Sequence, residues 1–256
     1  MSHALWTDPV PVEFSSGAWL SALGWVRLRL LDLTLATSRP RYQHADAGLL
    51  STAELGMIEA GTGSHARLAH IAIRAELRRV LGTELDVVPE RVPLPLRRGP
   101  DSTAPPSGVL TVRGQVGGCG FSVSSSRLMA VIATGFPPVG VHLRHLRTGD
   151  GTQTLTAMER RDLNSRDSAE HQVLSTMIGC GKYAVLAAIR AAGGHSTPIG
   201  VRFAIPRSGR PVLADIDGRG PAGMEVAWVR PDDQHILAVT GRGTALGTPM
   251  RLARLA

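Results

Sequence analysis

The feature that most constrains this chain is a short pattern that occurs once in each half. Residues 50–54 read Leu-Ser-Thr-Ala-Glu, and residues 155–159 read Leu-Thr-Ala-Met-Glu. A Ser or Thr three residues before a Glu is typical of a capping box, in which hydroxyl and carboxylate satisfy free backbone amides at a helix start. Because the same helix start occurs twice, the sequence predicts two pseudo-equivalent halves.

Apolar periodicity predicts the remaining elements. Two long helices are expected, the first with an arginine-rich outer face. Alternating or continuous apolar runs predict strands between and after the helices. The expected helices are 65–81 and 171–192, and the expected strands are 26–33, 128–133, 139–147, 201–205, 226–228 and 235–239. The mixture predicts an α+β fold, which we divide into an N-terminal half, 1–136, and a C-terminal half, 137–256.

Composition supports a globular chain. Of the 256 residues, 43% are apolar, and no run of 18 apolar residues predicts a membrane-spanning helix. Residues 1–8 have neither the basic nor the apolar region of a signal peptide. Cys119 and Cys180 form no metal or redox motif. We therefore expect a cytoplasmic protein with reduced thiols. Both cysteines lie near the motifs described below, so a nucleophilic role for one of them stays open.

The chain is strongly basic, with a formal net charge of +7 at pH 7. Such a surface suits an anionic partner. The arginines are scattered and not interleaved with aromatic residues, which argues against a nucleic-acid-binding protein. The two remaining interpretations are a solvated arginine-rich surface and a docking face for an acidic protein.

The stretch Val139–Arg147 reads Val-Gly-Val-His-Leu-Arg-His-Leu-Arg. Its apolar residues alternate with Gly140, His142 and Arg144, which predicts a strand with one apolar face. His142 and Arg144 then share the other face, roughly 6.5 Å apart along the strand.

This stretch resembles the Gly-(Ile/Val)-Asp-(Ile/Leu)-Glu signature of the surfactin-type 4′-phosphopantetheinyl transferases, with His142 at the Asp position and Arg144 at the Glu position. Residues 121–126 resemble the family's Phe-Asn-(Ile/Leu)-Ser-His-Ser, and residues 179–187 its Trp-x-x-Lys-Glu-Ala-x-x-Lys. In the latter Lys182 matches, and Tyr183 stands where the family has Glu. The Leu-Ser-x-x-Glu helix, the following arginine-rich helix and the final pair of strands also resemble the family, so the resemblance covers nearly the whole chain.

The resemblance implies two α/β halves with an active-site cleft between them, coenzyme A as ligand, and a carrier protein as partner. Family members hold magnesium with carboxylates. Replacing three carboxylates by His142, Arg144 and Tyr183 changes the local formal charge from −3 to about +1. Magnesium prefers oxygen ligands, and arginine cannot bind a cation. We therefore predict no metal site. Coenzyme A or phosphopantetheine remains a candidate ligand, with Arg144, Ser124, Ser126 and Arg67 as candidate contacts.

Three functions are compatible with this pattern. The chain could bind a carrier protein or its pantetheine arm without catalysis. It could act on a tethered polyketide or peptide intermediate by cyclisation, dehydration or release. His142 would then be the acid or base, Tyr183 a proton donor, and Arg144 with Lys182 an anion clamp. It could also transfer phosphopantetheine without metal. In each case we expect an acidic acyl or peptidyl carrier protein as partner, a monomer, and neither nucleic acid nor membrane.

Overall fold

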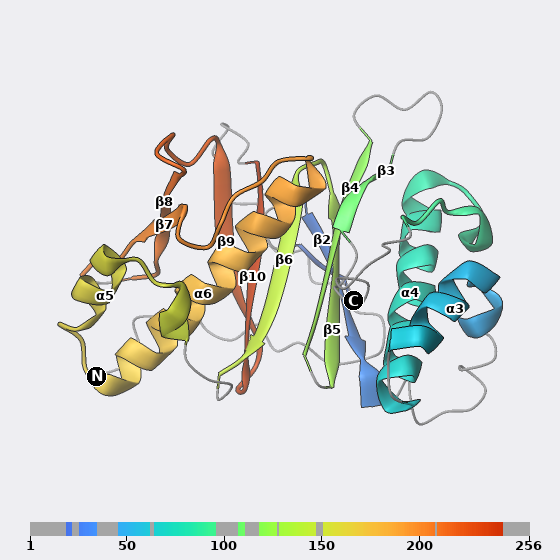
Figure 1. The fold of residues 1–256 in the computed structure, drawn as a ribbon, viewed down its shortest axis with the longest axis horizontal. Coiled ribbons are helices and arrows are strands. Elements are labelled where there is room, and N and C mark those ends of the chain that lie inside the picture. Colours follow the sequence, from blue (N-terminus) through green and yellow to red (C-terminus); the bar gives the residue numbers. More distant parts are fainter. Residues whose placement is uncertain are drawn as a thin grey trace, which may run out of the picture.

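The computed structural model describes residues 19–21, 26–34, 46–61, 64–95, 107–110, 118–126, 128–146, 151–207 and 209–242, and it confirms a mixed α+β fold with antiparallel sheets (Figure 1). The helices are α3 (Thr52–Gly61), α4 (Ser64–Leu85), α5 (Ala157–Leu163) and α6 (Ser168–Ala191), with short 3-10 turns η2 (Pro89–Arg91) and η3 (Gly151–Thr154). The strands are β1 (Trp19–Ser21), β2 (Val26–Asp32), β3 (Ser107–Leu110), β4 (Cys119–Ser126), β5 (Met129–Gly135), β6 (Val139–His145), β7 (Val201–Ala204), β8 (Val212–Ile216), β9 (Met224–Asp232) and β10 (His235–Arg242).

The described strands form three sheets. The largest has the order β1-β2-β5-β4-β3, the second β6-β10-β9, and the third pairs β7 with β8. All of these pairings are antiparallel. Every strand of the largest sheet precedes residue 136, and every strand of the other two follows it. Among the described strands, backbone pairing therefore stays within one half of the chain.

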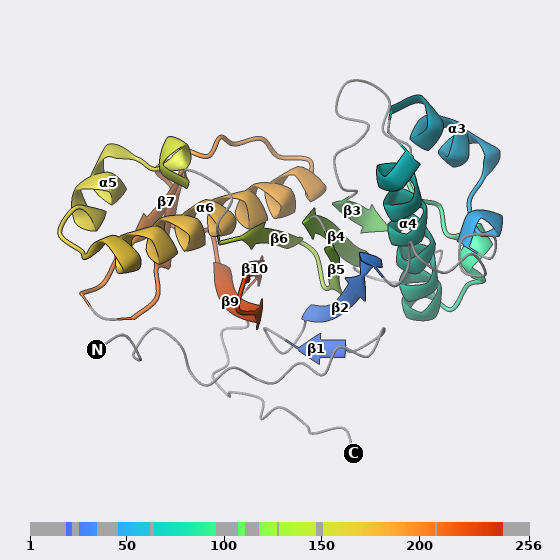
Figure 2. The same cartoon turned by 90° about the horizontal axis from the view of Figure 1, so that it is seen from below.

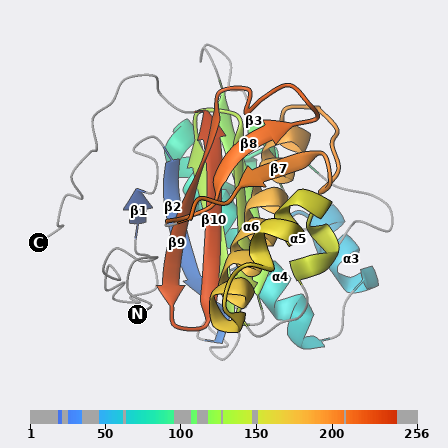
Figure 3. The same cartoon turned by 90° about the vertical axis from the view of Figure 1, so that its left-hand side faces the viewer.

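The two larger sheets pack against each other and are covered on their outer faces by the long helices (Figure 2). An apolar cluster joins β2 and β5 of the first sheet to β6 and β10 of the second. A second cluster packs α4 against the first sheet. A third packs α6 against β10 and the small sheet, which lies beside α5 and α6 (Figure 3). Alternation along each strand explains this layering, because successive side chains face opposite layers.

Helix α6 is the longest described helix, and it is also long and apolar enough to be a candidate membrane span by length and composition. Its most apolar window is 72% buried inside the folded protein. A helix that is apolar on most sides is expected in a protein core. We therefore interpret α6 as a core helix.

Most of the expected elements are confirmed within one to four residues. The two capping boxes start α3 and α5, and the expected closing strands form β7 and the β9–β10 hairpin. Strands β1, β3, β4 and β8 were not among the expected strands. Strands β1, β3 and β8 have only three to five residues, and in β8 only Leu213 and Ile216 are buried. Strand β4 contains the serine-rich stretch 121–126, which was interpreted only through its resemblance to a family motif. Residues 1–8 and Arg147 lie outside the described residues.

Candidate functional site

Strand β6 has the two faces that its alternation predicts. Val139, Val141 and Leu143 are buried in the cluster between the two large sheets. The opposite face of β6 carries Gly140, His142 and Arg144 and lies against α6, as the contact at Gly140 shows. His142 and Arg144 therefore share a face, as expected, and that face belongs to the second half of the chain.

Gly140 allows α6 to lie directly on β6. A Cβ atom at this position would come within 2.0 Å of the Ala184 carbonyl oxygen and 2.8 Å of the Ala188 nitrogen. Both are helix backbone atoms, which cannot rotate away as a side chain can. The glycine of the strand motif is thus required by the close approach of a helix, which places the next helix turn beside His142.

His142 contacts Tyr183, which α6 carries. The two ring centroids are 5.0 Å apart with an interplanar angle of 32°. Burial, together with the nearby charge of Arg144, lowers the pKa of His142 to about 4. The imidazole is therefore neutral at pH 7. Two of the three residues expected to act together, His142 and Tyr183, are brought together here.

The third residue, Lys182, is directed elsewhere. Its amine donates to Glu159 Oε2 at 2.7 Å and to the Thr154 carbonyl oxygen at 2.9 Å. The side chains of Lys182 and Glu159 are both 0% exposed. This corrects the expectation that Lys182 clamps an anion beside Arg144, because its charge is already neutralised by a buried carboxylate.

Glu159 also completes the capping box of α5. Its Oε2 accepts the Thr156 amide at 2.7 Å, and the Thr156 hydroxyl accepts the Glu159 amide at 3.2 Å. The other carboxylate oxygen accepts the Phe203 amide at 2.8 Å. One buried carboxylate thus joins α5, α6 and β7. The spacing of Thr156 and Glu159 predicted the capping role, but no sequence pattern predicted the pairing with Lys182.

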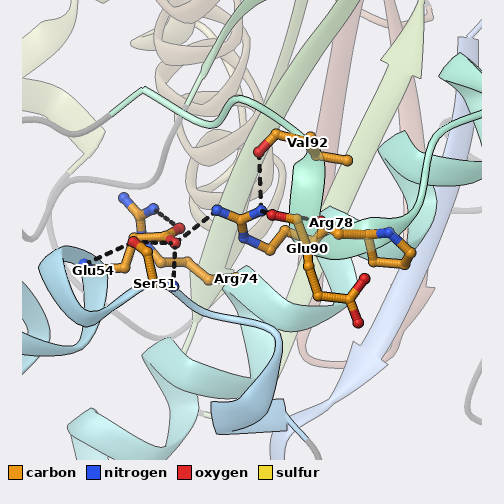
Figure 4. A network of polar contacts seen from close by, with 7 residues as sticks. Ser51, Glu54, Arg74, Arg78, Glu90 and Val92 are labelled. Carbon is orange, nitrogen blue, oxygen red and sulfur yellow. Dashed lines mark hydrogen bonds and ion pairs between the residues drawn. The ribbon is translucent and has the colours of Figure 1, made fainter.

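The first half contains the same arrangement (Figure 4). Glu54 is 1% exposed, and its carboxylate accepts the Ser51 amide at 2.9 Å and the guanidinium groups of Arg78 at 2.7 Å and Arg74 at 2.9 Å. Burial alone would raise the pKa of Glu54, but the hydrogen bonds from Arg78 and Ser51 outweigh it and the pKa is lowered. Arg78 also donates to carbonyl oxygens of η2 and Val92. Each half therefore has a capping-box glutamate held by a cation from its long helix.

The serines of β4 join the two large sheets. The hydroxyl oxygen of Ser122 accepts the Val141 amide at 3.1 Å, and that of Ser124 accepts the Leu143 amide at 2.9 Å. Ser124 is 4% exposed. The expectation that Ser124 offers its hydroxyl to a ligand is therefore corrected. Its oxygen accepts a backbone amide on the edge of β6 that does not pair with β10. Ser126 ends β4 and is half-buried, so its role as a ligand contact stays a prediction.

Arg67 lies in the first turns of α4 and forms an ion pair with Glu59 of α3 at 2.6 Å. Both side chains are largely exposed, at 45% and 53%. The pair joins two helices of the first half, whereas His142 and Tyr183 belong to the second. A contact between Arg67 and a ligand at His142 stays a prediction.

Neither thiol has the character of a nucleophile. Cys180 is fully buried and donates to the His142 carbonyl oxygen at 2.8 Å. Burial raises its pKa to about 12, and burial likewise raises the pKa of Cys119 to about 11. Because the thiolate is the reactive form, both cysteines are suppressed at neutral pH. Cys180 instead fastens α6 to the backbone of β6.

A second polar cluster lies at the end of β6 and β10. His235 bonds through Nδ1 to the carboxylate of Asp232, at 2.8 and 2.9 Å, and its ring meets that of His145 at a centroid distance of 5.1 Å. His145 and His235 are opposite each other in the strand register. The pairing of β6 with β10 supplies this contact, which the sequence alone does not reveal.

The residues at the positions where the resembled family holds magnesium do not fit that ion. They offer an imidazole, a guanidinium and a phenol, whereas magnesium prefers carboxylate oxygens and water. Within the described part of the chain, no group of three or more His, Cys, Asp or Glu residues is arranged to hold a metal ion. The arrangement can instead present hydrogen-bond donors and one positive charge to an anion.

A scan against models of known protein families gives no match, and a search of curated protein sequences also finds none.

Proposed function

We propose that this chain is a phosphopantetheinyl transferase-like protein that binds coenzyme A or the pantetheine arm of a carrier protein without catalysing metal-dependent transfer. In this proposal the fold has two pseudo-equivalent halves. The ligand's anionic group lies against Arg144, next to the paired rings of His142 and Tyr183. The biological setting would be polyketide or nonribosomal peptide assembly.

The observation that carries the proposal is the contact between His142 and Tyr183. These residues occupy two positions where the resembled family has carboxylates, and they lie on facing elements, β6 and α6. A neutral imidazole and a phenol beside Arg144 repel no anion. The site is therefore suited to hold a phosphate or a carboxylate directly through hydrogen bonds and the guanidinium charge.

The low pKa of His142 argues against a catalytic role for this residue. A general acid or base works best when its pKa lies near the working pH. With a pKa of about 4, His142 is a weak base, and at pH 7 only about one molecule in a thousand carries the proton. Lys182, the other group expected to assist, is held by Glu159. Binding is therefore better supported than turnover.

The net charge of +7 supports an acidic partner, and a carrier protein would supply both the negative surface and the pantetheine arm. Under this proposal the protein acts as a cytoplasmic monomer and binds neither nucleic acid nor membrane.

The test is a binding measurement with three ligands: coenzyme A, a holo carrier protein and the same carrier protein in its apo form. We expect the holo form to bind more tightly than the apo form, because only the holo form carries the phosphopantetheine arm. Arg144→Ala should weaken binding. Arg219→Ala removes an exposed arginine from the turn between β8 and β9 and serves as a charge-matched control.

Mass spectrometry of the same mixtures separates the alternatives. An apo carrier protein that gains the mass of phosphopantetheine from coenzyme A would contradict the proposal and support metal-independent transfer. An acyl carrier substrate that changes mass, and does so less with His142→Ala, would support a repurposed catalyst. No complex with any of the three ligands would overturn the proposal.

A further inference from the structure

Lys182 and Tyr183 are neighbours on α6 but have different partners. Lys182 reaches Glu159 and the Thr154 carbonyl oxygen, on the side of α5. Tyr183 contacts His142, on the side of β6. Successive residues of an α-helix project about 100° apart, because there are 3.6 residues per turn. The rotation of α6 about its axis is therefore coupled to both contacts.

Two further contacts join α6 to β6. Cys180 donates to the His142 carbonyl oxygen, and Gly140 brings the strand backbone against Ala184. Glu159 is itself fixed by the Thr156 and Phe203 amides. The Lys182 amine thus bonds to a carboxylate that cannot follow it if α6 turns.

From this geometry we infer that the buried Lys182–Glu159 ion pair is a positioning device, which sets the rotation of α6 and thereby holds Tyr183 against His142. Lys182 then acts on the candidate site through Tyr183 and does not contact the ligand. The importance of this contact for ligand binding rests on the proposed function. The positioning itself can be tested without any ligand.

The first half of the chain supplies a matched control. Arg78 and Glu54 are 24 residues apart, and Lys182 and Glu159 are 23 apart. In both halves the carboxylate is buried and belongs to a capping box. The Arg78–Glu54 pair joins α3 to α4 on the outer side of the first sheet, whereas the most extensive contacts of β6 are with α6, β4, β5 and β10. Breaking it removes a buried ion pair of the same kind without touching α6.

The experiment compares Lys182→Met with Arg78→Met. Lys182→Met leaves the buried Glu159 carboxylate without the lysine that it pairs with, and Arg78→Met leaves the buried Glu54 carboxylate with Arg74 as its described cation partner, so both should lower the denaturation midpoint. The measurement that distinguishes the two variants is the NMR titration of the His142 imidazole. The imidazole signal of His142 is assigned as the one that is missing in His142→Gln. In the wild type we expect a pKa of about 4. If Tyr183 leaves the ring, water reaches the imidazole, and the pKa should rise toward the ordinary value of 6.5.

We expect Lys182→Met to raise the pKa of His142 by at least one unit, and Arg78→Met to leave it unchanged. Glu159→Gln keeps the shape of the capping side chain while removing its charge. It should act in the same direction as Lys182→Met, and it replaces that variant if Lys182→Met does not fold. An unchanged His142 titration in both Lys182→Met and Glu159→Gln would overturn the inference. An equal rise in the pKa of His142 in Arg78→Met would also overturn it, because the rise would then reflect a general loss of stability.

Measuring ligand binding in addition to the His142 titration distinguishes a failure of this inference from a failure of the proposed function. If the wild type binds neither coenzyme A nor carrier protein but Lys182→Met still shifts the His142 titration, the function fails and the positioning stands. If the wild type binds and the titration does not respond, the function stands and the positioning fails.

Discussion

The contact between β6 and α6 makes a sharp prediction for Gly140→Ala. The added methyl group would lie 2.0 Å from the Ala184 carbonyl oxygen, whereas ordinary contact begins at 3.4 Å, so helix and strand would have to separate by 1.4 Å (3.4 − 2.0) at this point. The obstructing atoms are backbone and cannot change rotamer. Overpacking of a core typically costs 1–3 kcal/mol and occasionally more, and here we expect about 3 kcal/mol or more.

Gly56→Ala is the matched control. Gly56 lies inside α3, is exposed, and has no atom within 4 Å of the position of an added Cβ. Because alanine has a higher helix propensity than glycine, the free energy of unfolding of this variant should be higher than that of the wild type by about 0.5–1 kcal/mol. Urea denaturation, monitored by circular dichroism, measures the free energy of unfolding of both variants. A Gly140→Ala variant as stable as the wild type, with an unchanged m-value, would show that α6 does not lie on β6 as described.

Three further predictions concern single groups. Ser124→Ala leaves the buried Leu143 amide without its acceptor and should lower the free energy of unfolding by about 1–3 kcal/mol. Ser125→Ala, at an exposed position, is the control and should change the free energy of unfolding by less than about 0.5 kcal/mol. Equal effects of the two variants in urea denaturation would contradict the inter-sheet role of Ser124. The His142 imidazole has a folded pKa of about 4 against an ordinary 6.5, so its contribution is present above pH 6.5 and is lost as the pH falls toward 4. The loss is about 3 kcal/mol at most, read as the difference in unfolding free energy between wild type and His142→Gln, and a difference that does not vary with pH would contradict it. Cys180 should react with a thiol reagent only when the protein unfolds, and rapid labelling of that residue in the native protein, located by mass spectrometry, would contradict its burial.

Local patterns predicted the parts of this fold that depend on local geometry. The Ser51–Glu54 and Thr156–Glu159 spacings are properties of a helix start, so both capping boxes form as expected. The alternation in β6 likewise requires only that one face be buried. The same reasoning placed His142 and Arg144 on one face.

Contacts between distant elements were beyond the reach of those patterns. Helix periodicity cannot tell whether Lys182 reaches a ligand or Glu159, because that depends on where α5 packs. The hydroxyl of Ser124 could equally have faced solvent, and only the approach of β6 to β4 gives it the Leu143 amide. The pairing of His235 with Asp232 requires the turn between β9 and β10 to bring them together. Short strands such as β8 carry too few residues for a distinct pattern.

The proposed function requires the site beside His142, Arg144 and Tyr183 to hold an anion without a divalent cation. Calorimetric titration of the protein with coenzyme A, once in EDTA and once in excess magnesium, tests it most directly. We predict the same dissociation constant in both buffers. In each, Arg144→Ala should weaken binding roughly tenfold to a hundredfold, the loss expected for hydrogen bonds to a charged group. Binding that occurs only with magnesium, and that does not depend on Arg144, would contradict the account.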